Sequence, residues 1–253
     1  MNLCVDIGNT NTVIGVFDKN KVIYRWRIAT TSKDTFDDLK SRLFPLFIIE
    51  GVDKNLIKKV VVSSVVPMWN HSWERFCYDI FGIKPLFVGP GVKTGIRIAL
   101  ENPKEVGADR IVNSAAAIAQ FPEGAIIVDS GTAITIDIVS PQKVYLGGTI
   151  MPGITMSLDA LVAKTAKLHK ISLEKPDSAI GKSTTDGIRA GIYFGFVGMI
   201  DRCIEEILKE IDFKPKIIAT GGLAGEIAQG SKFIELYDRD LTLFGINLIA
   251  EAN

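Results

Sequence analysis

One short pattern occurs twice in this chain and constrains its fold more than any other feature. In its first occurrence, residues 1–30 contain an apolar strand that runs into Asp6-Ile-Gly-Asn-Thr10 and is followed by strands at Val13–Phe17 and Val22–Ile28. Turns rich in Asn, Gly and Asp separate the three strands. This arrangement predicts a three-strand antiparallel meander.

The second occurrence covers residues 124–150, where an apolar run ends in Asp129-Ser-Gly-Thr132. The strands that follow are expected at Ile136–Val139 and Lys143–Ile150. Asp6 matches Asp129, and Gly8 matches Gly131. Coincidence is the alternative, because short Gly-containing turns after strands are common in α/β proteins. The shared strand order favours an internal duplication.

Each half also supplies a later apolar strand that ends in small residues, at Lys59–Pro67 and at Lys216–Ala224. Helices are expected at Thr35–Glu50, interrupted by Pro45, at Trp69–Phe81, at Ala108–Gln120 and at Thr185–Ile211. The sequence therefore predicts an α/β protein with two duplicated lobes, residues 1–115 and 116–253. Each lobe is expected to hold a mixed sheet that opens with the meander and is flanked by helices.

Composition and charge favour a small ligand over a macromolecular one. The 253 residues are 47% hydrophobic, enough for a substantial core, and the 29 basic and 29 acidic residues cancel. A chain with zero net charge has no overall electrostatic attraction to nucleic acid or to anionic lipid. The cysteines share no CxxC or CxxH spacing, which argues against disulfides and zinc and suits a reducing cytoplasm: Cys4, Cys77 and Cys203.

The N-terminus lacks the basic start and long apolar stretch of a signal peptide.

Two apolar features are expected to belong to the core. The most membrane-like stretch, Gly187–Ile200, is too short to cross about 30 Å of hydrocarbon as a helix, and we expect it to be a buried helix. Aromatic residues at helical spacing are expected in the core: Trp69, Trp73 and Phe76. His71 and His169 have no metal-ligand partners at useful spacing.

The duplicated turns have the composition of phosphate-binding turns. Gly lets the backbone approach a ligand, while Asn and Thr add polar groups to the backbone N–H donors. A carboxylate beside a triphosphate needs a cation between them, so we expect Asp6 to hold Mg²⁺ directly or through water, with the same logic for Asp129. The alternative is that both residues only cap strand turns. Ile180-Gly-Lys-Ser-Thr184 is not a P-loop, because Pro176 stands where its first glycine should be.

Asp109 is the catalytic candidate. It lies with Arg110 in the first turn of the expected helix after Gly107. The positive end of the helix dipole and the neighbouring guanidinium both favour an ionised carboxylate, which could accept a hydroxyl proton during attack on a phosphate. The alternative is that Asp109 and Arg110 only stabilise the N-terminus of the helix.

Five motifs, in this order, make the chain resemble the type III pantothenate kinases of the actin-like ATPase superfamily over nearly its whole length. They are Asp6-Ile-Gly-Asn-Thr10, Asn102-Pro-Lys-Glu-Val-Gly-Ala-Asp-Arg110, Val128-Asp-Ser-Gly-Thr132, Gly147-Gly-Thr-Ile-Met-Pro-Gly153 and Ala219-Thr-Gly-Gly222. The resemblance implies actin-like (ribonuclease H-like) lobes and ATP-dependent phosphorylation of pantothenate, the first committed step toward coenzyme A.

The resemblance also implies roles for particular residues. Asp109 becomes the proton acceptor, and Asp129 falls where the family binds a monovalent cation, K⁺ or NH₄⁺. Pantothenate contacts are implied for Gly107, Ala108, Asp109, Arg110 and Thr184. ATP contacts are implied for Asp6, Ile7, Gly8, Asn9, Thr10, Asn11, Thr12, Val13 and Thr132, with Gly221 and Gly222 near the nucleoside.

One position departs from the family, because Leu100 stands where a tyrosine usually precedes Asn102-Pro103. Gly187, Gly191 and Gly195 leave a bare helical stripe that fits either tight packing inside one lobe or, as the resemblance implies, the seam of a homodimer. The alternative functions are a kinase for another small metabolite or a non-catalytic regulatory protein on the same fold.

Overall fold

The computed structural model describes residues 1–31, 33–163 and 174–253. The chain forms two compact units. The first contains Met1–Arg97, Glu101–Ala116 and Asp240–Asn253, and the second contains Ile98–Leu100 and Ala117–Arg239.

The first unit is built on a sheet with the strand order β3-β2-β1-β4-β5. The strands are β1 (Asn2–Ile7), β2 (Asn11–Asp18), β3 (Lys21–Ala29), β4 (Lys59–Ser64) and β5 (Leu86–Phe87). β1, β2 and β3 pair antiparallel, as the meander pattern predicts, whereas β4 lies parallel to β1.

The second unit repeats this order as β9-β8-β7-β10-β11, with β6 added beyond β9. The strands are β6 (Arg97–Ile98), β7 (Ala125–Ser130), β8 (Ala133–Val139), β9 (Val144–Pro152), β10 (Lys216–Gly221) and β11 (Leu236–Tyr237). β10 is parallel to β7, as β4 is to β1. The duplication expected from the sequence is therefore confirmed at the level of sheet topology.

The helices are α1 (Phe36–Ile49), α2 (Pro67–Phe81), α3 (Ala108–Gln120), α4 (Ile154–Ala163), α5 (Thr184–Glu210), α6 (Ala224–Ala228) and α7 (Leu241–Ala252). Two short 3₁₀ helices cover Lys54–Leu56 and Pro103–Glu105. The helices α4, α6 and α7, and the two-residue strands, have no counterpart in the sequence prediction, because their patterns are too short or too uniformly apolar to show a period.

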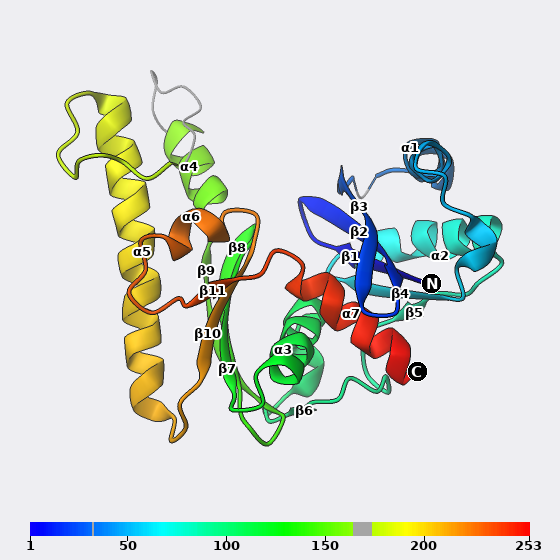
Figure 1. Cartoon of the computed structure of the whole chain (residues 1–253). Coiled ribbons are helices and arrows are strands. Elements are labelled where there is room, and N and C mark those ends of the chain that lie inside the picture. The colour runs from blue at the N-terminus through cyan, green and yellow to red at the C-terminus, as the bar shows by residue number, and fades with distance from the viewer. Residues whose placement is uncertain (32, 164–173) are drawn as a thin grey trace. The chain divides into compact units, whose positions relative to one another are not determined.

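Alternation along β1 explains how the first unit is layered. Leu3, Val5 and Ile7 point to the side of α1 and α2, where they share a core with the three predicted core aromatics of α2, all fully buried: Trp69, Trp73 and Phe76. Asn2 points to the other side, where its amide donates to Asn247 of α7 over 3.0 Å. Figure 1 shows α7, in red, on the side of this sheet opposite to α1 and α2.

The position of α7 changes the expected division of the chain. The sequence placed residues 116–253 in one lobe, but Asp240–Asn253 belongs to the first compact unit. The physical reason is burial, because α7 covers β1 and β4 with side chains that are almost fully buried: Leu241, Leu243, Ile246 and Ile249.

Two helix predictions also need correction. α1 continues through Pro45 without a break, since Leu43 and Phe47 on either side anchor it in the core. α5 contains Gly187–Ile200 as a helix, but only one face is buried, by residues such as Tyr193 and Phe196, whereas Phe194 and Met199 are exposed. In Figure 1, α5 runs in yellow along one side of the second sheet.

Candidate active site

The first duplicated turn joins β1 to β2. Its backbone closes through Gly8, whose N–H donates to the carbonyl of Asn11 over 3.1 Å, and a β-carbon on Gly8 would lie 3.0 Å from that oxygen. Asn9, Thr10 and Asn11 are exposed, whereas Thr12 is buried and shares a 2.9 Å hydroxyl–hydroxyl hydrogen bond with Thr30. The exposed tip of the turn therefore offers polar groups to a ligand, and the Thr12 side chain holds the turn from below.

The second turn is also closed by the N–H of its glycine, but it is one residue shorter. The N–H of Gly131 donates to the carbonyl of Ala133, two residues on, over 3.0 Å, whereas the N–H of Gly8 donates to the carbonyl of Asn11, three residues on. The N–H of Gly153, the last residue of the Gly147–Gly153 motif, donates to the carbonyl of Thr132 over 3.1 Å. A β-carbon on Gly153 would collide with the carbonyl oxygens of Gly131 and Thr132. Glycine at 153 is thus required for the Thr132 turn to keep its shape.

Each turn carboxylate has a hydroxyl residue beside it on the neighbouring parallel strand. Asp6 is in register with Ser63 of β4, and Asp129 is in register with Thr220 of β10. Ser63 and Thr220 are both buried. The sequence analysis assigned neither of them, although each is the fifth residue of an apolar strand that follows a meander. Their common place is visible only once the strands are paired.

The Gly221 turn lies directly against Asp129 in the second unit. Gly221 adopts a φ of +98°, and a β-carbon there would lie 2.6 Å from Oδ1 of Asp129 and 2.6 Å from the carbonyl oxygen of Ser130. Gly222 follows it and is exposed. The structure therefore brings together Asp129 and Gly221, two residues that the sequence placed in separate motifs.

Asp109 lies in the first turn of α3, in the first unit with Asp6. Its Oδ1 accepts a 2.8 Å hydrogen bond from the backbone N–H of Arg110. A β-carbon on Gly107 would lie 3.6 Å from Val65 Cγ1, and the N–H of Val65 donates to the carbonyl of Ile7 over 3.0 Å. The Asp109 turn is thereby held at the end of β4, next to the end of the strand that carries Asp6.

Burial shifts the pKa of Asp109 in the direction opposite to the one that the sequence indicated. The sequence indicated that the helix start and the Arg110 charge favour ionisation, and both the Arg110 N–H and its charge do lower the pKa of Asp109. Removal from water outweighs them, so the pKa of Asp109 is raised above its ordinary value. A raised pKa makes the ionised carboxylate a better proton acceptor than an ordinary aspartate.

The remaining candidates divide between the units. Ala108 and Arg110 accompany Asp109, whereas Thr184 lies in the second unit as the exposed first residue of α5, just after the N-cap Ser183. His169 lies outside the described residues. Among the residues that the structure describes, no three His, Cys, Asp or Glu side chains cluster as a metal site, and no helix could span a membrane.

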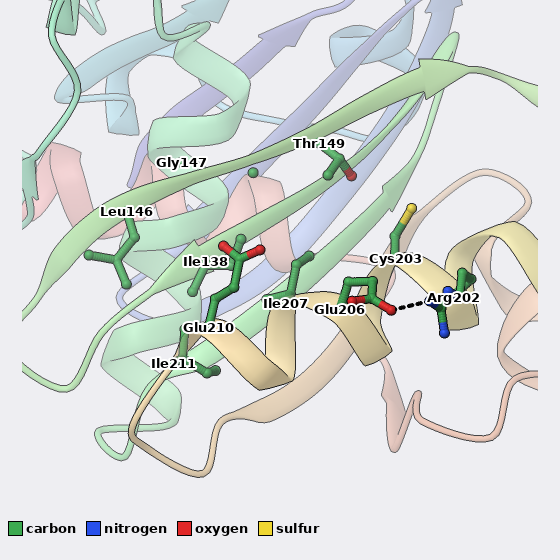
Figure 2. Close-up of a pocket in the computed structure, with 11 residues that line it drawn as sticks. Ile138, Leu146, Gly147, Thr149, Arg202, Cys203, Glu206, Ile207, Glu210 and Ile211 are labelled. Atoms are coloured by element: carbon green, nitrogen blue, oxygen red, sulfur yellow. Dashed lines mark ion pairs between the residues drawn. The ribbon is translucent and has the colours of Figure 1, made fainter.

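A pocket of about 450 Å³ opens between the second sheet and α5 (Figure 2). Figure 2 shows side chains of the last turns of α5, Glu206, Ile207 and Glu210, opposite Leu146 and Thr149 of β9. None of the predicted site residues lines it.

Comparison with known proteins identifies the family of the chain. The family model described as Type III pantothenate kinase matches residues 2–206. Proteins named type III pantothenate kinase from Anaeromyxobacter sp. (strain Fw109-5) and Geobacillus thermodenitrificans are 45% and 44% identical over all 253 residues, which cover 100% and 98% of those proteins. The Myxococcus xanthus protein of that name is 43% identical over the whole chain and 99% of its own length.

Among solved structures, the fold is similar to that of a Campylobacter jejuni protein assigned to the Baf family of transcriptional activators. The TM-score is 0.63 at 20% identity, covering 99% of this chain and 98% of the other. It is also similar to the activator of 2-hydroxyisocaproyl-CoA dehydratase from Clostridium difficile, with a TM-score of 0.59 at 13% identity over 98% and 93% of the two chains. At these identities the likeness concerns the fold, an actin-like ATPase fold, as the sequence predicted.

Proposed function

Given that the chain belongs to the type III pantothenate kinase family, we propose that Asp109 is the base of its reaction. The activity is ATP-dependent phosphorylation of pantothenate to 4′-phosphopantothenate, in coenzyme A biosynthesis. The observation that supports Asp109 is its partly buried carboxylate, held by the Arg110 N–H and with a pKa raised by burial.

The chemistry requires one proton transfer and one phosphoryl transfer. As the primary hydroxyl of pantothenate attacks the γ-phosphorus, Asp109 accepts the hydroxyl proton, the bond to the β,γ-bridging oxygen breaks, and ADP leaves. Arg110, beside the base, contacts the acidic end of pantothenate in this proposal, together with Gly107, Ala108 and Thr184. The guanidinium suits a carboxylate because its N–H groups match both oxygens.

The two duplicated turns suit the nucleotide. The exposed tip from Asn9 to Asn11 and the Thr132 turn present N–H, hydroxyl and amide groups of the kind that phosphate oxygens accept. Mg²⁺ prefers oxygen ligands and keeps several waters, so a single carboxylate such as Asp6 fits it. When bound, Mg²⁺ offsets charge on the β- and γ-phosphates. Asp129 offers a carboxylate oxygen to a monovalent cation, K⁺ or NH₄⁺, in the second unit.

A homodimer is part of this proposal. The Gly187, Gly191 and Gly195 positions of α5 are exposed, and a β-carbon on any of them would meet no atom within 4 Å in the described chain. Gly181 packs against the backbone of Gly187, but the open side of the stripe meets no residue of its own unit among those that the structure describes. The exposed Phe194 and Met199 lie beside it on the same helix. A second copy of the chain would cover both the bare stripe and these apolar side chains.

We also propose that this enzyme acts in the cytoplasm, where a kinase of coenzyme A biosynthesis would meet ATP and pantothenate.

The test is ADP release by the purified protein with ATP and Mg²⁺, with and without pantothenate and with K⁺ or Na⁺. We expect release that needs pantothenate and K⁺, and a loss of about 10²–10⁴-fold in the Asp109→Asn variant. Asp37→Asn is the matched control, since Asp37 also lies in the first turn of a helix but is exposed.

The outcomes separate the parts of the proposal. Release without any pantothenate dependence would overturn the assignment of the acceptor. Full activity of Asp109→Asn would remove Asp109 as the base while leaving the kinase in place. Equal rates in K⁺ and Na⁺ would remove the cation from Asp129.

A further inference from the structure

We propose that Tyr237 is a positioning residue that fixes the peptide group between Gly221 and Gly222 for nucleotide binding. This inference rests on the proposed function of these two glycines at the nucleotide. Tyr237 lies outside every motif that the sequence analysis identified, near the end of the second unit, and its hydroxyl donates to the carbonyl oxygen of Gly221 over 3.3 Å.

The sheet brings Tyr237 to this place. In the short strand β11, Tyr237 is in register with Ala219 of β10, and the next N–H, that of Asp238, donates to the Ala219 carbonyl over 2.9 Å. From this position the Tyr237 side chain extends along β10 toward its carboxyl end, two residues further on, at Gly221. The contact therefore depends on the parallel pairing of β10, which ends at Gly221, with β11, which lies further along the chain.

The side chain also lies against α6. A β-carbon on Gly225 would be 3.4 Å from Cε1 of the Tyr237 ring, an ordinary van der Waals distance, so the ring lies next to the start of this helix. The same ring forms one wall of a pocket of about 440 Å³ that α6 and β11 line together. Tyr237 is 39% exposed, so it borders solvent and is not part of the core.

The Gly221–Gly222 peptide needs such an anchor. A peptide group between two glycines has fewer steric barriers to rotation than any other, because neither neighbour carries a β-carbon. The peptide bond is trans, so its C=O and N–H point in opposite directions. When Tyr237 holds the Gly221 carbonyl, it also fixes the direction of the Gly222 N–H, which lies at an exposed residue and is a donor suited to a nucleotide.

The hydrogen bond from Tyr237 to the Gly221 carbonyl also affects the surroundings of Asp129. Because the α-carbon of Gly221 packs so closely that a β-carbon would be 2.6 Å from Asp129 Oδ1, rotation of the Gly221 backbone would disturb the surroundings of that carboxylate. Tyr237 thus acts on the nucleotide, and on the proposed cation site, through the backbone of Gly221. It does not need to touch either ligand.

The experiment compares wild type, Tyr237→Phe and Tyr78→Phe, the last being an exposed tyrosine of the first unit that serves as control. Binding of a non-hydrolysable ATP analogue with Mg²⁺ is measured by calorimetry without pantothenate, followed by steady-state kinetics and the melting temperature. Loss of one hydrogen bond should weaken analogue binding and raise the KM for ATP by about fivefold in Tyr237→Phe. We expect kcat, the KM for pantothenate and the melting temperature to stay close to wild type.

The inference is overturned if Tyr237→Phe binds the analogue as tightly as wild type. It is also overturned if both KM values rise together with a lower melting temperature, because that pattern indicates a merely structural role. The binding measurement needs no pantothenate, so it decides the role of Tyr237 even if the wild type phosphorylates a different acceptor.

Discussion

A methyl group on Gly107 would collide with the carboxylate oxygen Oδ1 of Asp109. The same oxygen accepts the N–H of Arg110, so the carboxylate lies folded back over the start of α3. Glycine at 107 is therefore a requirement of the Asp109 rotamer. The Gly-Ala-Asp-Arg motif encodes a side-chain position as well as a set of functional groups.

Replacing Gly107 with alanine should push the Asp109 carboxylate out of place. We expect kcat to fall by about 10- to 100-fold, since small displacements of a reacting group have effects of this size. Steady-state kinetics measures this fall in kcat. Gly89→Ala is the control, because a β-carbon at Gly89 meets nothing within 4 Å. Normal turnover by Gly107→Ala would show that the carboxylate position is not critical.

The raised pKa of Asp109 makes a prediction about stability. A carboxyl whose pKa is higher in the folded than in the unfolded state favours folding in acid, and this contribution is lost as the pH rises through the folded pKa. Asp109→Asn, uncharged throughout and still able to accept the Arg110 N–H, should melt at a higher temperature than wild type at about pH 7.5. The difference should vanish toward about pH 4, near the ordinary pKa of aspartate.

Scanning fluorimetry across that pH range measures this difference in melting temperature. Asp37→Asn should show no such pH-dependent gain. A variant that is less stable than wild type at neutral pH would contradict the dominance of burial.

The bare stripe of α5 makes a prediction about assembly. Gly191→Leu should place a bulky side chain in the proposed seam and convert a dimer to a monomer, since its β-carbon meets no atom of the described residues within 4 Å. Light scattering coupled to size exclusion measures the mass. Gly89→Leu, where the surroundings are equally open, should leave the mass unchanged. A wild type that is monomeric at micromolar concentration would rule the seam out.

A buried polar cluster in the second unit makes a prediction about folding. Asp137 is fully buried and accepts hydrogen bonds from Tyr145 Oη over 2.7 Å and from Thr135 Oγ1 over 2.9 Å. Tyr145→Phe removes a donor to a buried acid and should lower the free energy of unfolding by about 1.5–3 kcal/mol. Urea unfolding measures it, with Tyr78→Phe as the exposed control. An unchanged midpoint would mean that the cluster reorganises.

The cysteines make a prediction about labelling. All three are free, and burial raises the pKa of the Cys4 and Cys77 thiols well above their ordinary value. Cys203 is partly exposed and lines the pocket of Figure 2. Iodoacetamide with peptide mapping should modify Cys203 first and the other two only after denaturation. Rapid modification of Cys77 in the native protein would indicate opening of the α2 core.

Much of this structure could be predicted because the pattern of one half of the sequence can be compared with that of the other half. The match of Asp6 with Asp129 predicted corresponding turns, and in the structure each turn is closed by the N–H of its glycine, Gly8 or Gly131, although the second turn is one residue shorter. The aromatic core of α2 could be predicted because its spacing admits only one buried face. The contacts of Ser63, Thr220 and Tyr237 could not, since each depends on which strands pair in parallel, and parallel pairing has no local sequence signal.

The direction of the pKa shift of Asp109 also could not be predicted from the sequence. A helix start and a neighbouring arginine are visible in the sequence, whereas loss of solvent around a side chain depends on residues distant in the chain, such as Val65 beside Gly107. The expectation of a buried helix at Gly187–Ile200 was wrong for a related reason. This apolar, glycine-rich stretch has no polar side that would mark which of its faces is exposed, so the sequence left open whether its glycine stripe packs inside one lobe or in a dimer.

The place of α7 bears on how the chain is made. The second unit is nearly continuous in sequence, from Ala117 to Arg239, whereas the first unit needs both Met1–Arg97 and Asp240–Asn253. The first unit begins earlier but must wait, with one face of β1 and β4 uncovered, until its last helix emerges. The half that is translated first therefore cannot complete its fold until the segment that is translated last has been made.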